Sequence, residues 1–129
     1  MDSSLRRRFS AAAAIAVIAL VLAACGDGEP VAEGSPPADA PHVSVSATEY
    51  AYEVSSKTLE PGVVVFDLTN NGSMEHDLVL EGGPGGGTQI IGPGETDSFF
   101  VTLEPGTYTL YCSVGNHRAQ GMEFTITVM

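Results

Sequence analysis

From residue 42 to the C-terminus, short runs of alternating hydrophobic and polar residues are separated by turns rich in Gly and Pro. A period of two is typical of β-strands that bury one face. The runs with strand character are 43–46, 50–54, 63–69, 78–80, 98–103, 107–112 and 124–128. We find no segment that combines a helix start signal with a period of 3.6 residues. Seven or eight short strands with regular turns predict an all-β protein, a β-sandwich with Greek-key connections.

The first 41 residues differ from the rest in both pattern and composition. Residues 1–24 combine a basic start with an apolar run at 11–24, which has the length of a signal peptide and is short for a membrane span. Residues 26–41 are rich in Pro, Gly, Ala and acidic residues, which predicts an extended linker without a core. We therefore expect a signal peptide at 1–24, a linker at 25–41 and one folded domain at 42–129.

The chain is strongly acidic, with 16 Asp and Glu against 5 Lys and Arg and a formal charge of −11. Without the predicted leader, Lys57 and Arg118 are the only Lys or Arg residues left. Such a protein repels phosphate groups, so we expect no nucleic-acid binding. A basic protein partner would be attracted, although the acidity could equally serve solubility.

Three side chains with metal-binding chemistry, Cys112, His117 and Met122, fall within eleven residues. Thiolate and thioether are soft ligands that favour copper(I), and imidazole suits both copper oxidation states. Two His and one Cys with a weak axial Met make a blue-copper electron-transfer site. The second His must come from upstream, and His76 is the best candidate. Zinc fits this set less well because it rarely recruits a thioether.

Each candidate ligand also has an ordinary structural interpretation. Either His could be an exposed loop residue, Met122 could belong to the core, and Cys112 could be a small buried hydrophobe. Alternation along the strands argues for the metal, because each ligand shares a face with apolar neighbours. These neighbours are Leu78 and Leu80 for His76, Tyr108 and Leu110 for Cys112, and Phe124, Ile126 and Val128 for Met122. We therefore expect three ligands to point between the sheets, with His117 supplied by a loop.

The segment Asn70-x-Gly72-x-x-x-His76, followed by Cys112-x4-His117-x4-Met122, resembles the cupredoxin family of type 1 copper proteins. The spacings are similar to those of the rusticyanin and auracyanin type, and the Cys-to-His gap is longer than in plastocyanin. The resemblance covers residues 43–129. It implies one mononuclear copper held by His76, Cys112, His117 and Met122, single-electron transfer through the His117 ring edge, and no catalysis.

The tetrapeptide Leu22-Ala-Ala-Cys25 resembles a bacterial lipobox. This resemblance implies that Cys25 is lipidated and that the protein is a lipoprotein anchored to the cell membrane, outside the cytoplasm. Its partners would then be redox proteins, such as a basic cytochrome or a terminal oxidase, and we expect a monomer.

Three other functions stay open at this point. A copper-delivery or copper-buffering lipoprotein would use the same ligands. A copper enzyme or sensor would leave Met122 unbound and an open position on the metal. If the protein is a β-sandwich that binds no metal, the spacing of the candidate ligands is a coincidence.

Asp77 departs from the family pattern, in which the residue after the first His is commonly Asn and ties the two ligand loops together. Asp can accept the same hydrogen bonds but adds a charge. Because groups around the ligands tune a metal, we predict that Asp77 lowers the reduction potential.

Overall fold

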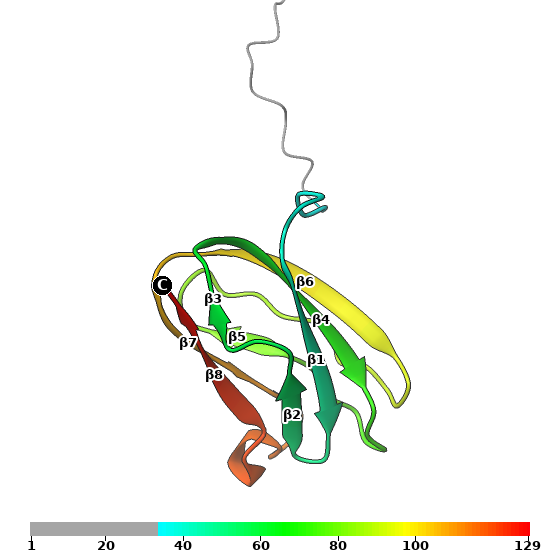
Figure 1. Ribbon diagram of the computed structural model, residues 1–129. Helices are drawn as coiled ribbons and strands as arrows, with labels where there is room; N and C mark the ends of the chain where they lie inside the picture. Colours follow the sequence, from blue (N-terminus) through cyan, green and yellow to red (C-terminus); the bar gives the residue numbers. More distant parts are fainter. Residues whose placement is uncertain (1–33) are drawn as a thin grey trace, which may run out of the picture. The chain divides into compact units, whose positions relative to one another are not determined.

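The computed structural model describes residues 34–129, which form two packed β-sheets (Figure 1). The strands in this range are β1 (His42–Thr48), β2 (Ala51–Val54), β3 (Thr58–Leu59), β4 (Gly62–Asn70), β5 (Val79–Glu81), β6 (Thr96–Leu103), β7 (Gly106–Tyr111) and β8 (Glu123–Val128). One short 3-10 helix, η1 (Arg118–Gln120), precedes β8. These eight strands among the described residues confirm the predicted all-β sandwich.

The chain crosses between the two sheets with Greek-key connections. The first has the order β2-β1-β4-β6, and the second has the order β3-β8-β7-β5. The pairs β1–β4 and β3–β8 are parallel, and the other pairs are antiparallel. Because parallel neighbours need a crossover connection, the chain passes from one sheet to the other between β1 and β4 and returns. The loop after β4 and the end of β7 meet in this topology, and β7 pairs with β8.

The core lies between the sheets and follows the alternation along each strand. In β1 and β8 every second residue is buried, which matches the predicted inward-facing set. The central strand β4 contributes Phe66 and Leu68, both 0% exposed, and Phe66 stacks on Phe99 with ring centroids 5.2 Å apart. Burial of a side chain of this size stabilises the fold by about 2–3 kcal/mol.

Three local features differ from the sequence prediction. The two-residue strand β3 was not predicted, because two residues show no alternation. The predicted strand 78–80 begins only at Val79, since the Leu78 amide donates to Thr88 Oγ1 at 3.0 Å and His76 instead forms an isolated bridge with Ile91. Helix η1 was not predicted either, because a single 3-10 turn has no readable period.

The predicted signal peptide and Cys25 lie outside the described residues, as does the linker up to residue 33. Across residues 34–129, no helix has the length and apolar character needed to cross a membrane.

Candidate metal centre

Three of the four predicted ligands meet at one end of the sandwich. Cys112 Sγ lies 3.6 Å from His117 Nδ1 and 3.9 Å from His76 Nδ1. The ligand atoms of the three residues all lie within 4.8 Å of one another. All three side chains are buried, with His76 0%, Cys112 1% and His117 3% exposed. The parity argument therefore predicted correctly that His76 and Cys112 face inward.

Met122, the fourth predicted ligand, closes the same loop. It is 0% exposed and belongs to the hydrophobic core that contains Cys112. The Met122 amide donates to the His117 carbonyl at 3.2 Å, and the Cys112 amide donates to the Met122 carbonyl at 3.1 Å. The backbone thus joins the three downstream residues directly.

The loop from β7 to β8 is shaped by its own backbone hydrogen bonds. The His117 amide donates to Val114 at 3.1 Å, and the Gly121 amide donates to Arg118 at 2.9 Å. Gly121 has φ +104°, a left-handed conformation that favours glycine and lets the chain turn back into β8. The loop ends are fixed because β7 and β8 pair along their length.

The loop that carries His76 is instead shaped by the buried side chain of Asn70. Its amide group donates to the carbonyls of Met74 at 2.8 Å and Ile91 at 3.0 Å, and its oxygen accepts from the Gly72 amide at 3.0 Å. The backbones of His76 and Ile91 exchange two further bonds, at 2.8 and 3.1 Å. The Asn-x-Gly part of the motif therefore builds the loop that presents His76.

Asp77 links the two ligand loops, which is the role that the family resemblance implied for this position. Its Oδ1 accepts from the Ser113 amide at 2.7 Å, and its Oδ2 accepts a hydrogen bond from the Ser113 hydroxyl. The carbonyl of Asp77 accepts from the Tyr52 hydroxyl. With Asp77 only 3% exposed, this carboxylate lies beside the cluster in an environment of low polarity.

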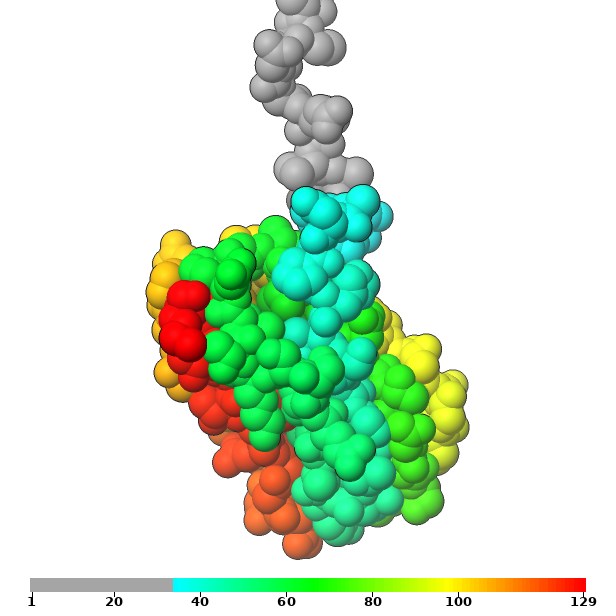
Figure 2. All heavy atoms as spheres, in the orientation of Figure 1, coloured from blue at the N-terminus to red at the C-terminus, as the bar shows by residue number. Residues whose placement is uncertain are grey.

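Glu49 and Tyr50, between β1 and β2, also reach the site, and sequence reasoning missed both. Glu49 Oε1 lies 3.2 Å from His76 Nε2, and the Tyr50 ring meets His117 edge-on with centroids 5.1 Å apart. Figure 2 shows atoms of the β1–β2 turn adjoining those of the segment before β8 at this end of the molecule. No local signal distinguishes Glu49 from the other acidic residues, because its partner is 27 residues away.

Burial raises the pKa of the Cys112 thiol above its usual value. Backbone amides of Asp77 and Val114 oppose this effect, while the Asp77 carboxylate adds to it. Burial is also the main reason that the pKa of the Tyr52 hydroxyl is raised. Cys112 is therefore a neutral thiol at neutral pH until a cation displaces its proton.

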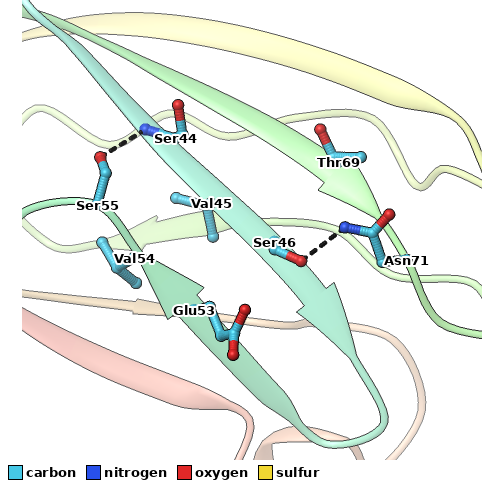
Figure 3. Close-up of a pocket in the computed structure, with 8 residues that line it drawn as sticks. All are labelled: Ser44, Val45, Ser46, Glu53, Val54, Ser55, Thr69 and Asn71. Carbon is cyan, nitrogen blue, oxygen red and sulfur yellow. Dashed lines mark hydrogen bonds between the residues drawn. The ribbon is translucent and has the colours of Figure 1, made fainter.

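Two other residues with potential ligand atoms lie outside the cluster. His42 is exposed and its Nδ1 lies 2.7 Å from Asp67 Oδ2. Met74 is 42% exposed, with its sulfur 3.8 Å from the Tyr50 hydroxyl. An open hollow on the first sheet, lined by residues such as Val45, Glu53 and Asn71, contains none of the predicted ligands (Figure 3).

The donor set tests which metal fits. The ligand atoms of two imidazoles and one thiol already lie together. With the thioether of Met122 at the end of the loop that begins at Cys112, this donor set fits one type 1 copper site. The geometry needs no large rearrangement to surround one ion, because the three ligand atoms already converge.

Comparisons with known proteins agree with this assignment. Residues 39–129, more than half of the chain, match the family model for copper-binding proteins of the plastocyanin/azurin family. No match was found among curated protein sequences.

Solved structures show the same fold. Dithionite-reduced auracyanin from the photosynthetic bacterium Roseiflexus castenholzii is 21% identical with a TM-score of 0.60, covering 70% of this chain and 98% of that one. Auracyanin B is 25% identical with a TM-score of 0.60, covering 74% of this chain and 91% of that one. Rusticyanin from Thiobacillus ferrooxidans is 24% identical with a TM-score of 0.57, covering 68% and 76%. With this fold, this donor cluster and the family match, the chain belongs to the plastocyanin/azurin family of copper-binding proteins, the cupredoxins.

Proposed function

We propose that the protein carries single electrons between redox partners, with one type 1 copper bound by His76, Cys112, His117 and Met122. The observation that supports this most directly is the buried cluster in which Cys112 Sγ lies 3.6 and 3.9 Å from two histidine Nδ1 atoms. Copper bound by these donors would exchange one electron by alternating between its two oxidation states. Cys112 would supply a thiolate, His76 and His117 would each supply an imidazole nitrogen, and Met122 would supply a weakly bound thioether.

The chain's contribution to electron transfer is to hold the ligands still. Cys112 and Met122 are tied by a backbone hydrogen bond, and Asp77 ties the His76 loop to Ser113. A ligand set that is buried and bonded in this way changes little when the charge at its centre changes. Four protein ligands would leave no open coordination position on the copper for a substrate, so we propose no catalytic activity.

Electrons would enter and leave through the His117 ring. This ring lies at the end of the sandwich and is covered by Tyr50, whose hydroxyl lies 3.8 Å from the sulfur of the exposed Met74. Arg118 is next in the chain, but its charge is paired with Glu81 and Glu123. The acidity of the chain therefore favours a basic redox partner, such as a cytochrome, and a terminal oxidase is a further candidate.

The sequence also supports a cellular location for the electron transfer. We propose that lipidated Cys25 anchors the protein to the cell membrane, facing outside the cytoplasm as in the periplasm or at the cell surface. The Pro-rich linker would let a monomeric copper domain reach membrane-bound partners.

The test is the visible spectrum after addition of copper(II). We expect an intense blue thiolate-to-copper band that bleaches on reduction and returns on oxidation. A colourless protein whose Cys112 still reacts with thiol reagents would overturn the proposal. Ready transfer of copper to a chelator would favour copper delivery instead, and a spectral change on adding azide would reveal an open coordination position.

A further inference from the structure

The Glu49 carboxylate makes a set of contacts that the copper-binding motif does not explain. Its Oε1 accepts hydrogen bonds from the amides of Ser73 and Met74, each at 2.7 Å, and lies 3.2 Å from His76 Nε2. The His76 side chain is 0% exposed and that of Glu49 is 26% exposed. The three contacts span 24 to 27 residues, so they are tertiary contacts between the β1–β2 turn and the His76 loop.

Gly72 provides the room for this carboxylate. A Cβ atom at Gly72 would lie 2.5 Å from Glu49 Oε1 and 3.0 Å from its Cδ. The absence of a side chain at this position therefore lets the carboxylate reach both the loop amides and the His76 ring.

The contacts determine which nitrogen of His76 carries the proton. Oε1 of Glu49 accepts from the backbone amides of Ser73 and Met74, so this oxygen faces the His76 ring as a hydrogen-bond acceptor. His76 Nε2 is therefore the nitrogen that carries a proton and donates to it. A neutral imidazole has one such proton, which leaves a lone pair on Nδ1, the atom that faces Cys112.

We propose that Glu49 is a positioning residue for the metal centre, which holds His76 with Nδ1 free to bind copper and favours the oxidised metal over the reduced one. This inference rests on the proposed function, because it takes His76 as a copper ligand. A carboxylate behind a ligating histidine raises the basicity of the ring and adds a negative charge near the metal. Both effects stabilise copper(II) more than copper(I), so Glu49 lowers the reduction potential.

The alternative is that Glu49 only caps the Ser73 and Met74 amides and has no effect on the metal. Three variants separate the two roles. Glu49→Gln removes the charge but keeps an oxygen that accepts from the two amides. Gly72→Ala keeps the charge but forces the carboxylate away from His76, with no positive φ to make alanine unfavourable. Glu75→Gln is the control, because Glu75 is exposed, adjoins His76 in sequence and is equal in charge.

The first measurement is the reduction potential of the copper-loaded protein. We expect Glu49→Gln to weaken copper(II) binding relative to copper(I) by about tenfold, which raises a one-electron potential by about 59 mV. Gly72→Ala should shift the potential in the same direction, and Glu75→Gln should shift it much less because an exposed charge is screened by salt. Equal shifts in Glu49→Gln and Glu75→Gln would overturn the proposal.

The second measurement is the ¹⁵N spectrum of the His76 ring in the unmodified, metal-free protein. We expect the proton on Nε2, and a proton on Nδ1 would overturn the proposal whatever the potentials show. If the unmodified protein does not turn blue with copper, the electron-carrier function fails, while the ring spectrum still decides whether Glu49 sets the tautomer.

Discussion

The two loops that supply the ligands are held in different ways. The shape of the Cys112–Met122 loop comes from hydrogen bonds between its own backbone groups, with β7 and β8 fixing its ends. The Asn70–His76 loop is held by side chains that reach across the structure. Asn70 bonds to Ile91, and Glu49 comes from the β1–β2 turn.

This difference explains why the Cys112–Met122 loop can be predicted from the sequence and the Asn70–His76 loop only in part. A loop built from local backbone contacts keeps its ligands close together in the chain, as Cys112 and His117 are. A loop built from distant side chains shows only the residues that lie inside it, here Asn70 and Gly72. The following five predictions test the two loops and the contacts around them.

The largest effect is expected from Cys112→Ser. Serine lacks the soft thiolate, so the blue band should be lost completely, as measured by the visible spectrum with copper(II). Cys25→Ser is the matched control and should keep the full band. A blue Cys112→Ser protein would exclude Cys112 as the thiolate ligand.

Asn70→Ala tests whether buried side chains hold the upstream loop. The variant leaves the Met74 and Ile91 carbonyls without their partner, which should lower the free energy of unfolding by about 3 kcal/mol. Urea unfolding of the metal-free protein measures this change. Asn116→Ala, in the downstream loop, should cost less than about 0.5 kcal/mol because Asn116 is exposed and helps its loop through its backbone carbonyl. Equal costs would remove the contrast between the loops.

Asp77→Asn changes the contact between the two loops. Asparagine keeps an oxygen that can accept from the Ser113 amide but removes a buried charge beside the metal. The reduction potential should rise by on the order of 50 mV, close to a tenfold change in relative affinity. Voltammetry measures it, and Asp39→Asn, at an exposed position, serves as the charge control. An unchanged or lower potential would contradict the prediction.

Arg118→Gln should give the smallest effect. Arg118 binds Glu81 at 2.7 Å and Glu123 at 2.8 Å and lies 4.2 Å from the centre of the Tyr111 ring, all near the surface. We expect Tm to fall by only about 2–4 °C, and less at high salt. Lys57→Gln is the control for loss of one cation.

The stabilisation that the Glu81 carboxylate gains from Arg118 depends on pH. The hydrogen bond from Arg118 lowers the pKa of Glu81 below 4.5, so its stabilisation is present above that value and is lost as pH falls through the lowered pKa. The Tm difference between the unmodified protein and Arg118→Gln should therefore be constant near neutral pH and shrink in acid. A difference that grows in acid would contradict this assignment.

Most of the fold could be predicted because its strands bury one face. Alternation in β1 and β8 identified the inward residues directly. The same rule failed for β3, which is too short to alternate. It also misplaced the start of β5, because Leu78 bonds to the Thr88 side chain instead of continuing a strand.

For the candidate site, the positions of His76, Cys112, His117 and Met122 along the chain predicted the cluster of three ligand atoms and the burial of Met122. The family resemblance implied that the residue after His76 ties the two ligand loops, and the structure identifies Ser113 as the partner of Asp77. Glu49 and Tyr50 could not be predicted, because a turn with ordinary composition becomes part of the site only through the way the two sheets pack.

Sequence by itself therefore determined the chemistry of this protein: the donor types, their order and the alternation that turns them inward. These are properties of side chains and of local backbone geometry. Only the tertiary structure decided what surrounds the donors, namely the carboxylate behind His76, the ring over His117 and the bond from Asn70 to Ile91. The physical reason is that these contacts join groups far apart in the chain, so they depend on packing that no local pattern records.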